Sequence, residues 1–274
     1  MIDAHQHFWH YDATEYEWID DGMALLRRDF LPSDLLRDIH AVGVTGTIAV
    51  QARQSMRETR WLLGLARANS FIRGVVGWAP LADASCPNLL DEFAGEAKLV
   101  GLRHVVQGEP DGFLGGAAFN EGIDALDGTE LVYDILIVER QLPEAIAFVD
   151  RHPNQVFVLD HIAKPRIAES TLESWATNIA ELALRENVYC KLSGMVTEAD
   201  WRGWTAAALR PYVDVVLGAF TPRRLMFGSD WPVCTVATSY SRWVSTLGEL
   251  LAALSDDERE RVFSGTAIEA YRLK

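Results

Sequence analysis

Histidine side chains stand at the ends of several short apolar runs in this sequence, and the first two form a pair. His5 and His7 are two residues apart at the end of the run 2–4, so on an extended strand both imidazoles point to the same side. Two imidazoles that face one point are a common arrangement for a divalent metal. The alternative is a pair of structural histidines near the N-terminus, and the spacing alone does not decide between the two.

Asp230 is a candidate for activating water. It follows the apolar run 223–227 in a Gly-Ser-Asp-Trp-Pro segment, and a carboxylate there can bind a metal, take a proton from water, or do both. An aspartate that only shapes a turn or caps a helix is the alternative. His161, which follows another apolar run, can complete a metal site or polarise a carbonyl, unless it is a buried histidine that only hydrogen-bonds Asp160.

Two cations and several polar or aromatic residues lie at similar positions. Arg103 and Lys191 suit a substrate carboxylate, a sugar hydroxyl or a developing oxyanion, and a salt bridge at the rim of the fold is the alternative for both. The indole rings of Trp18 and Trp231 offer an apolar face to a sugar ring. The predicted catalytic residues are Asp230, His161 and Lys191. The predicted substrate contacts are Arg103, His104, Gln51, Trp18 and Trp231.

The apolar runs that precede these residues are typical of buried strands. They lie at residues 2–4, 46–50, 72–78, 99–103, 131–137, 155–159, 187–191 and 223–227. Most are continuous and rich in Val, Ile and Leu, as a parallel sheet buried on both faces requires. Helical patterns lie between or after them, at residues 56–67, 142–151, 170–184, 211–220, 239–254 and 256–271.

The alternation of strand and helix patterns predicts an α/β fold, most simply a (β/α)8 TIM barrel that forms a single domain over residues 1–274. In such a barrel the carboxyl ends of the strands build the active site, which is where the candidate residues stand. A doubly wound nucleotide-binding fold is the weaker alternative, because neither a GxGxxG nor a Walker motif is present. Residues 10–36 are predicted to be a lid or pocket-wall loop, and residues 256–274 to form C-terminal helices.

The composition excludes several other classes of protein. The 274 residues are 49% hydrophobic and 23% charged, an ordinary globular balance, and the formal net charge is −14. Such a charge argues against nucleic acid or an anionic membrane as a partner. The three dispersed cysteines predict no disulfide framework, and with no signal peptide and no long apolar run we expect a cytoplasmic protein. The sequence does not indicate an oligomeric state.

Several motifs together resemble the amidohydrolase superfamily. They are the pair His5-x-His7, Leu159-Asp160-His161 with Lys164-Pro165, Lys191-Leu192-Ser193-Gly194, and Gly228-Ser229-Asp230-Trp231-Pro232. The sequence is most similar to the lactonase branch, which includes the 2-pyrone-4,6-dicarboxylate lactonases and the sugar aldonolactonases. Within it, the segments 3–9, 48–53, 139–143 and 196–201 look most like the L-fuconolactonases.

The resemblance implies a (β/α)8 barrel that opens a lactone ring with water. It implies that Asp230 is the general base, and that the histidines surround the carbonyl or a metal. It also implies that Arg103, His104 and Lys191 contact the substrate or stabilise the oxyanion. Many amidohydrolases bind two metals through a carboxylated lysine and a histidine on strands four and five. The fourth run here ends in Arg103-His104, and the fifth, which continues to Glu139-Arg140, holds no histidine.

At most one divalent metal is therefore expected, with zinc as the first candidate. Its ligands would be His5, His7, Asp230 and His161. The metal can also be dispensable, because a lactone is an activated ester and one well-placed oxyanion donor contributes ~3–4 kcal/mol.

The leading functional hypothesis is hydrolysis of a sugar aldonolactone, with L-fucono-1,5- or 1,4-lactone as the first candidate. A lactonase for a pyrone dicarboxylate is one alternative, but it needs a cluster of arginines of which only Arg103, Arg53 and Arg140 are candidates. A metal-dependent decarboxylase and a non-catalytic sugar-acid binding protein are the others. The sequence does not fix the stereochemistry of the sugar.

Overall fold

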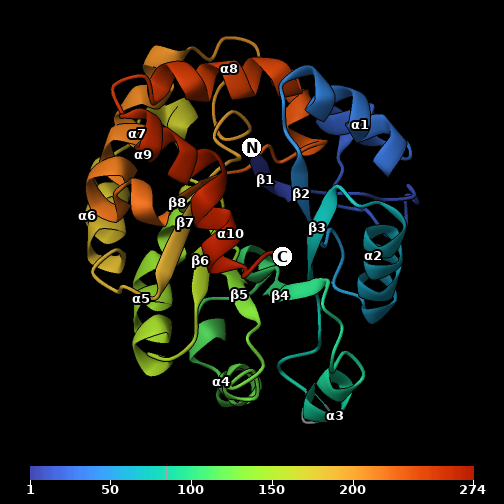
Figure 1. Cartoon of the computed structure of the whole chain (residues 1–274). Helices are drawn as coiled ribbons and strands as arrows, with labels where there is room; N and C mark the ends of the chain where they lie inside the picture. Colours follow the sequence, from blue (N-terminus) through green and yellow to red (C-terminus); the bar gives the residue numbers. More distant parts are fainter. Residues whose placement is uncertain (84–85) are drawn as a thin grey trace.

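A computed structural model describes residues 1–83 and 86–274 and shows a barrel of parallel strands (Figure 1). Eight strands pair in chain order, and every neighbouring pair from the first to the eighth is parallel. The predicted fold class is confirmed, and all eight predicted strands are present. Their bounds are β1 (Ile2–Gln6), β2 (Gly46–Val50), β3 (Ile72–Gly77), β4 (Leu99–His104), β5 (Val132–Ile135), β6 (Phe157–Leu159), β7 (Val188–Leu192) and β8 (Leu225–Phe227).

The barrel closes where the end of β1 meets the segment after β8. The Asp230 amide donates a hydrogen bond to the carbonyl of His5 at 2.8 Å, and the His7 amide donates to the carbonyl of Trp231 at 2.7 Å. The same backbone pairing that closes the sheet thus sets two histidines beside the aspartate. The hydrogen bonds that close the barrel therefore also assemble the site.

Helices surround the sheet in Figure 1 and bury one face against it. On α2, for example, the buried positions Thr59, Leu62, Leu63 and Ala66 recur at intervals of three or four, as an amphipathic helix requires. No helix in the described ranges has the length and apolarity needed to cross a bilayer. The first helices are α1 (Pro32–Ala41), α2 (Met56–Ala68), α3 (Cys86–Asp91), α4 (Ala117–Asp124) and α5 (Leu142–Arg151). The others are α6 (Glu173–Leu182), α7 (Ala206–Phe220), α8 (Tyr240–Leu250), α9 (Asp256–Glu260) and α10 (Thr266–Ala270).

The segment predicted to be a lid, residues 10–36, is more ordered than a loop. It contains a 3-10 helix at Asp21–Leu26, and its last five residues belong to α1. The connection is held to the barrel by a bridge between Trp9 and Phe30, whose amides and carbonyls exchange bonds of 3.0 and 2.9 Å. Residues 10–31 therefore form the connection proper.

The segment 256–274 contains the helices α9 and α10, which cover the amino-terminal end of the barrel. Ala267, Ala270 and Tyr271 pack into an inner apolar cluster with strand residues such as Val132 and Val158. In Figure 1, α10 lies across the middle of the strands, between the two chain ends. The inner cluster closes this end of the barrel, so a ligand must enter from the other end.

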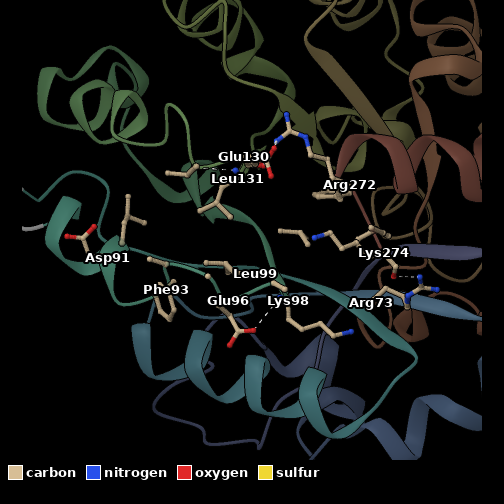
Figure 2. Close-up of a pocket in the computed structure, with 18 of the residues that line it drawn as sticks. Arg73, Asp91, Phe93, Glu96, Lys98, Leu99, Glu130, Leu131, Arg272 and Lys274 are labelled. Carbon is tan, nitrogen blue, oxygen red and sulfur yellow. Dashed lines mark hydrogen bonds and ion pairs between the residues drawn. The ribbon is translucent and has the colours of Figure 1, made fainter.

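A pocket of about 690 Å³ lies beside this C-terminal segment, at the amino-terminal strand ends (Figure 2). Three of its cations are engaged: Arg272 pairs with Glu130 at 3.3 Å, the Lys98 ammonium donates to a backbone carbonyl at 2.8 Å, and Arg73 donates to the carbonyl of Lys274. This pocket is remote from the strand ends that carry the candidate residues.

Candidate active site

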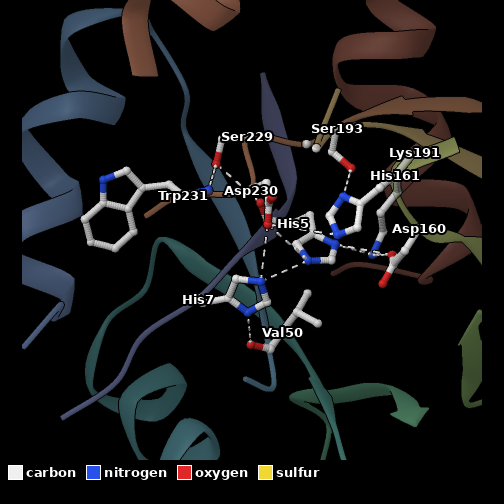
Figure 3. A network of polar contacts seen from close by, with 12 residues as sticks. His5, His7, Val50, Asp160, His161, Lys191, Ser193, Ser229, Asp230 and Trp231 are labelled. Carbon is white, nitrogen blue, oxygen red and sulfur yellow. Dashed lines mark hydrogen bonds and ion pairs between the residues drawn. The ribbon is translucent and has the colours of Figure 1, made fainter. Parts of the chain in front are cut away.

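Three histidines and one aspartate meet at the carboxyl ends of β1, β6 and β8 (Figure 3). The Nε2 atoms of His5 and His7 are 3.1 Å apart. Asp230 Oδ1 lies 3.4 Å from His7 Nε2, 3.9 Å from His5 Nε2 and 4.0 Å from His161 Nε2. All four side chains are less than a tenth exposed. The structure therefore assembles all four predicted metal ligands around one small space.

Hydrogen bonds behind the imidazoles fix which ring nitrogens face that space. His7 Nδ1 lies 2.8 Å from the carbonyl oxygen of Val50. A carbonyl only accepts, so Nδ1 carries the proton and Nε2 keeps its lone pair. His161 Nδ1 is 2.9 Å from Ser193 Oγ, which leaves its Nε2 directed at Asp230.

Burial sets the charge of these groups. It lowers the pKa of His161 to about 4, and it also lowers the pKa of His5 well below the usual value. Burial by itself would raise the pKa of Asp230, but its interactions with the surrounding imidazoles, His161 foremost, outweigh burial and hold that pKa below the ordinary range. At neutral pH the site therefore presents an ionised carboxylate beside neutral His5 and His161, which are the forms that bind a metal.

The donor set fits one zinc ion. Zinc–nitrogen bonds of 2.0–2.1 Å in a tetrahedron place neighbouring ligand atoms about 3.3 Å apart. The distances of 3.1 and 3.4 Å bracket this value, and those of 3.9 and 4.0 Å need a small inward shift. Lone pairs on two nitrogens 3.1 Å apart repel unless a cation or a proton lies between them. The ligand atoms of His5, His161 and Asp230 lie within 4.8 Å of one another, and His7 Nε2 adjoins this group at 3.1 Å from His5 and 3.4 Å from Asp230, so these residues can hold a divalent ion.

Beneath the histidines lies a layer of buried charge. The Lys191 ammonium is fully buried and contacts Asp134 Oδ2 at 2.5 Å, Asp160 Oδ1 at 2.9 Å and His5 Nδ1 at 3.2 Å. Arg103 Nη1 donates to Asp160 Oδ2 at 2.9 Å. Both cations are therefore in salt bridges, the alternative that the sequence left open.

Lys191 does not enter the pocket that the substrate would occupy. It is the buried support of His5, and it is neutralised from two sides by carboxylates. Burial raises the pKa of Asp134 to about 6 against the opposing charge of Lys191. The Tyr271 hydroxyl donates to the same carboxylate at 2.8 Å. The C-terminal segment that closes the barrel therefore completes the layer of buried charge.

The pocket above the four residues has a volume of about 720 Å³ and opens at the carboxyl ends of the strands. Of the predicted residues it contains His7, His161, Asp230, Arg103 and Trp18. The structure does not bring Gln51, His104 or Trp231 into it.

Gln51 and Trp231 face other parts of the protein. Gln51 is fully buried, and its amide donates to the carbonyl of Arg103 at 3.2 Å. Trp231 packs against Phe8 and Phe30, with ring centroids 6.1 and 5.3 Å away, and its indole points away from the cluster in Figure 3. Its side chain lies opposite to that of Asp230.

His104 supports a neighbouring loop. Its Nε2 lies 2.8 Å from Glu109 Oε1, and its ring stacks on Phe113 with centroids 4.8 Å apart. Burial lowers the pKa of His104, so it is neutral near pH 7. These contacts direct the imidazole away from the substrate space.

Several residues that line the pocket are not among the predicted substrate contacts. Lys164 and Glu198 form an ion pair of 3.7 Å on one side, and Arg53 pairs with Glu15 on another. The remaining walls come from Met23, Ala52, Gln54, Ser55, Val105, Gln107, Leu136, Thr197 and Val233. Most stand one to five residues beyond a strand end, so a wider window after each strand would have found them.

A barrel that gathers histidines and an aspartate at its carboxyl strand ends brings together groups that can bind a metal and activate water. A family model described as amidohydrolase matches residues 2–273. The chain belongs to the amidohydrolase family, and the resemblance seen in its motifs is confirmed.

Relatives of known name share the whole length of the chain. An L-fucono-1,5-lactonase of Burkholderia multivorans is 46% identical and covers 99% of this chain and 96% of its own. A second L-fucono-1,5-lactonase, from Burkholderia ambifaria, is 37% identical over 99% of this chain and 95% of its own. The crystal structure of an amidohydrolase from Burkholderia multivorans with bound zinc superposes with a TM-score of 0.96 at 45% identity, covering 100% of this chain and 99% of the other.

Proposed function

We propose that this protein hydrolyses the lactone of a sugar acid, and that L-fucono-1,5-lactone is its substrate. The observation that carries the proposal is the cluster of His5, His7 and His161 around Asp230, of which His7, His161 and Asp230 line an open pocket. Identities of 46% and 37% to two L-fucono-1,5-lactonases over nearly the whole chain support the substrate.

Asp230 acts as the general base. Its carboxylate takes a proton from a water molecule, and the resulting hydroxide adds to the lactone carbonyl. His5 and His161 beside it are neutral at pH 7, so neither adds a positive charge that would oppose this proton transfer. When the resulting adduct collapses, the ring C–O bond breaks, and the proton held by Asp230 passes to the leaving alkoxide. The product is the open-chain sugar acid.

A divalent ion held by His5, His7, His161 and Asp230 would lower the pKa of a bound water and polarise the carbonyl. Arg103 lines the pocket, and its Nη1 lies 3.3 Å from His5 Nε2. Its fixed positive charge stabilises the oxyanion that develops on the carbonyl oxygen. We propose a single metal, because this guanidinium occupies the space beside His5.

The charge of the pocket favours a neutral sugar over a dicarboxylate. Its cations Arg53, Arg103 and Lys164 are each paired, with Glu15, Asp160 and Glu198 respectively. Two substrate carboxylates would have to displace these partners. Arg140 pairs with Asp111 and is not among the lining residues. Paired polar side chains of both signs suit the donors and acceptors of sugar hydroxyls.

A pH-indicator assay tests the proposal directly, because ring opening releases a proton. The purified protein is offered fresh L-fucono-1,5-lactone, the 1,4-lactone, several stereoisomeric aldonolactones and 2-pyrone-4,6-dicarboxylate, and the spontaneous rate is subtracted. Fastest turnover of an L-fuconolactone supports the proposal. Preference for the dicarboxylate, or no turnover of any lactone, overturns it and favours the pyrone lactonase or a binding or decarboxylating role.

Chelation extends the same assay to the metal. Zinc removed by dipicolinate and restored by titration should abolish and restore turnover if the ion is needed. Unchanged turnover after its removal, verified by elemental analysis, shows that Asp230 and Arg103 suffice. We also place the reaction in the cytoplasm, which the three unpaired buried cysteines support.

A further inference from the structure

The backbone that carries His161 is wound in the left-handed sense. Four successive residues, His161 to Lys164, have φ values of +52°, +49°, +61° and +48°. Asp230 has a φ of +58°. Side chains of L-residues disfavour this conformation, and a run of four without glycine does not persist unless its surroundings impose it. Two site residues therefore depend on groups that hold a strained backbone.

An indole N–H holds the first of these segments. Trp175 lies on α6 and is only 1% exposed. Its Nε1 donates a hydrogen bond of 2.7 Å to the carbonyl of Ile162, the residue directly after His161. Ile162 is itself fully buried, so no water replaces that donor. The bond ties the middle of the left-handed turn to the helix outside the barrel.

A second indole does the same near Asp230. Trp243 lies on α8, is 1% exposed, and donates from Nε1 to the carbonyl of Gly228 at 2.9 Å. Gly228 packs so closely on His5 that a Cβ added to it would lie 2.9 Å from His5 Cβ. Gly228 is two residues before Asp230. The bond from Trp243 therefore holds the backbone segment whose position sets the distance between Asp230 and His5.

We propose that Trp175 and Trp243 are positioning residues, whose indole N–H groups hold the backbone of His161 and Asp230 in the geometry that binds zinc and activates water. Neither ring lines the pocket, so both act through the carbonyls they bond. The kinetic part of this inference rests on the proposed lactone hydrolysis, whereas the zinc-binding part does not.

The test replaces each tryptophan by phenylalanine, which removes the N–H donor and keeps an aromatic ring. Trp204→Phe is the matched control. Trp204 is also buried, at 5% exposure, and donates from Nε1 to the carbonyl of Ala237 at 2.9 Å, but neither residue lines the pocket. The control therefore loses the same kind of bond away from the four site residues.

Three measurements separate a positioning role from a merely structural one. All three variants are expected to show similar decreases in melting temperature. Zinc affinity, measured by competition with a chromophoric chelator, and kcat are expected to fall 10- to 100-fold in Trp175→Phe and Trp243→Phe. KM should stay within about threefold, and Trp204→Phe should match the wild type in both zinc affinity and kcat. Equal zinc affinity in all four proteins overturns the proposal.

Indole resonances of the wild-type protein give a second test that needs no variant to fold. In apoprotein labelled with ¹⁵N-tryptophan, added Zn²⁺ should shift the Nε1–H signals of Trp175 and Trp243 and leave that of Trp204 in place. Shifts absent from both, or equal in all three, contradict the proposal. If the wild type opens no lactone, the proposed function fails, and the zinc and resonance measurements still decide the inference.

Discussion

Gly194→Ala probes how closely the active site is packed. Gly194 follows β7 and has a φ of +64°, and a Cβ built on it would lie 2.6 Å from His161 Nδ1 and 2.7 Å from His161 Cγ. Ordinary van der Waals contact begins near 3.4 Å. The added methyl group would therefore have to push the His161 ring by roughly 0.8 Å or be pushed back itself. Either movement breaks the hydrogen bond between His161 and Ser193.

The expected size follows from these numbers. The left-handed conformation costs alanine about 1 kcal/mol more than glycine, which lowers the free energy of unfolding by that amount. A displacement of a site group by roughly 1 Å costs on the order of 100-fold in rate. We therefore expect kcat/KM for L-fucono-1,5-lactone to fall about 100-fold, measured with the pH indicator.

Gly43→Ala is the control for the backbone cost. Gly43 has a φ of +74°, is exposed after α1, and a Cβ there meets nothing within 4 Å. Urea titration should show a loss of about 1 kcal/mol for Gly43→Ala, with full activity, and a larger loss for Gly194→Ala, which also breaks a buried hydrogen bond. An active Gly194→Ala enzyme, within threefold of the wild type, would refute the packing argument.

Three further predictions concern buried charge. Lys191→Met removes the ammonium between Asp134 and Asp160, and because breaking a buried pair leaves charges uncompensated, urea denaturation should show a loss of about 3–5 kcal/mol; a loss below 1 kcal/mol would contradict this. Burial raises the pKa of Glu58 from its usual 4.5 to about 7, so the folded state holds a proton that the unfolded chain releases. The resulting stability is complete below pH 4.5 and declines as the pH rises through 7, by about 3 kcal/mol in all. Glu58→Gln should therefore gain stability relative to the wild type between pH 5 and 8, and a difference that stays constant with pH is the contrary result. Because burial lowers the pKa of His161 to about 4, its imidazole in the apoprotein should stay unprotonated down to about pH 5, whereas an exposed histidine is half protonated near 6.5; the NMR chemical shifts of the His161 ring followed from pH 4 to 8 measure this, and a midpoint near pH 6 contradicts it.

The sequence was sufficient for the barrel and for the four central residues. Continuous apolar runs are what a parallel sheet buried on both faces needs, and all eight fell on strands. Because every parallel strand ends at the same rim, the position of His5, His7, His161 and Asp230 after a run already implied that they meet. The predicted set of metal ligands rested on these strand ends together with the family resemblance.

Local helix signals were less informative. The helices α1, α3 and α4 were not predicted, and two of them have only 6 and 8 residues. Short helices of this kind are stabilised by packing against the sheet rather than by a strong periodic pattern. The helix α1 has 10 residues, and its first five lie in the segment predicted to be a loop.

The sequence did not predict how deeply each side chain lies below the rim formed by the carboxyl ends of the strands. Lys191 and Arg103 both end strands, yet Lys191 is buried beneath His5 and Arg103 reaches the pocket. Which cation sits in the charged layer depends on the carboxylates supplied by two other strands. The left-handed backbone at His161 and Asp230 was equally unpredictable from the sequence, because it depends on tertiary hydrogen bonds.

The central claim is that Asp230 activates the water that opens the lactone. Asp230→Asn keeps the size of the side chain and removes the base, and the measurement is kcat on L-fucono-1,5-lactone at saturating zinc, with bound zinc and the melting temperature checked. We predict a decrease of about 10²- to 10⁴-fold in a folded protein that still binds zinc. Turnover within tenfold of the wild type would contradict the account.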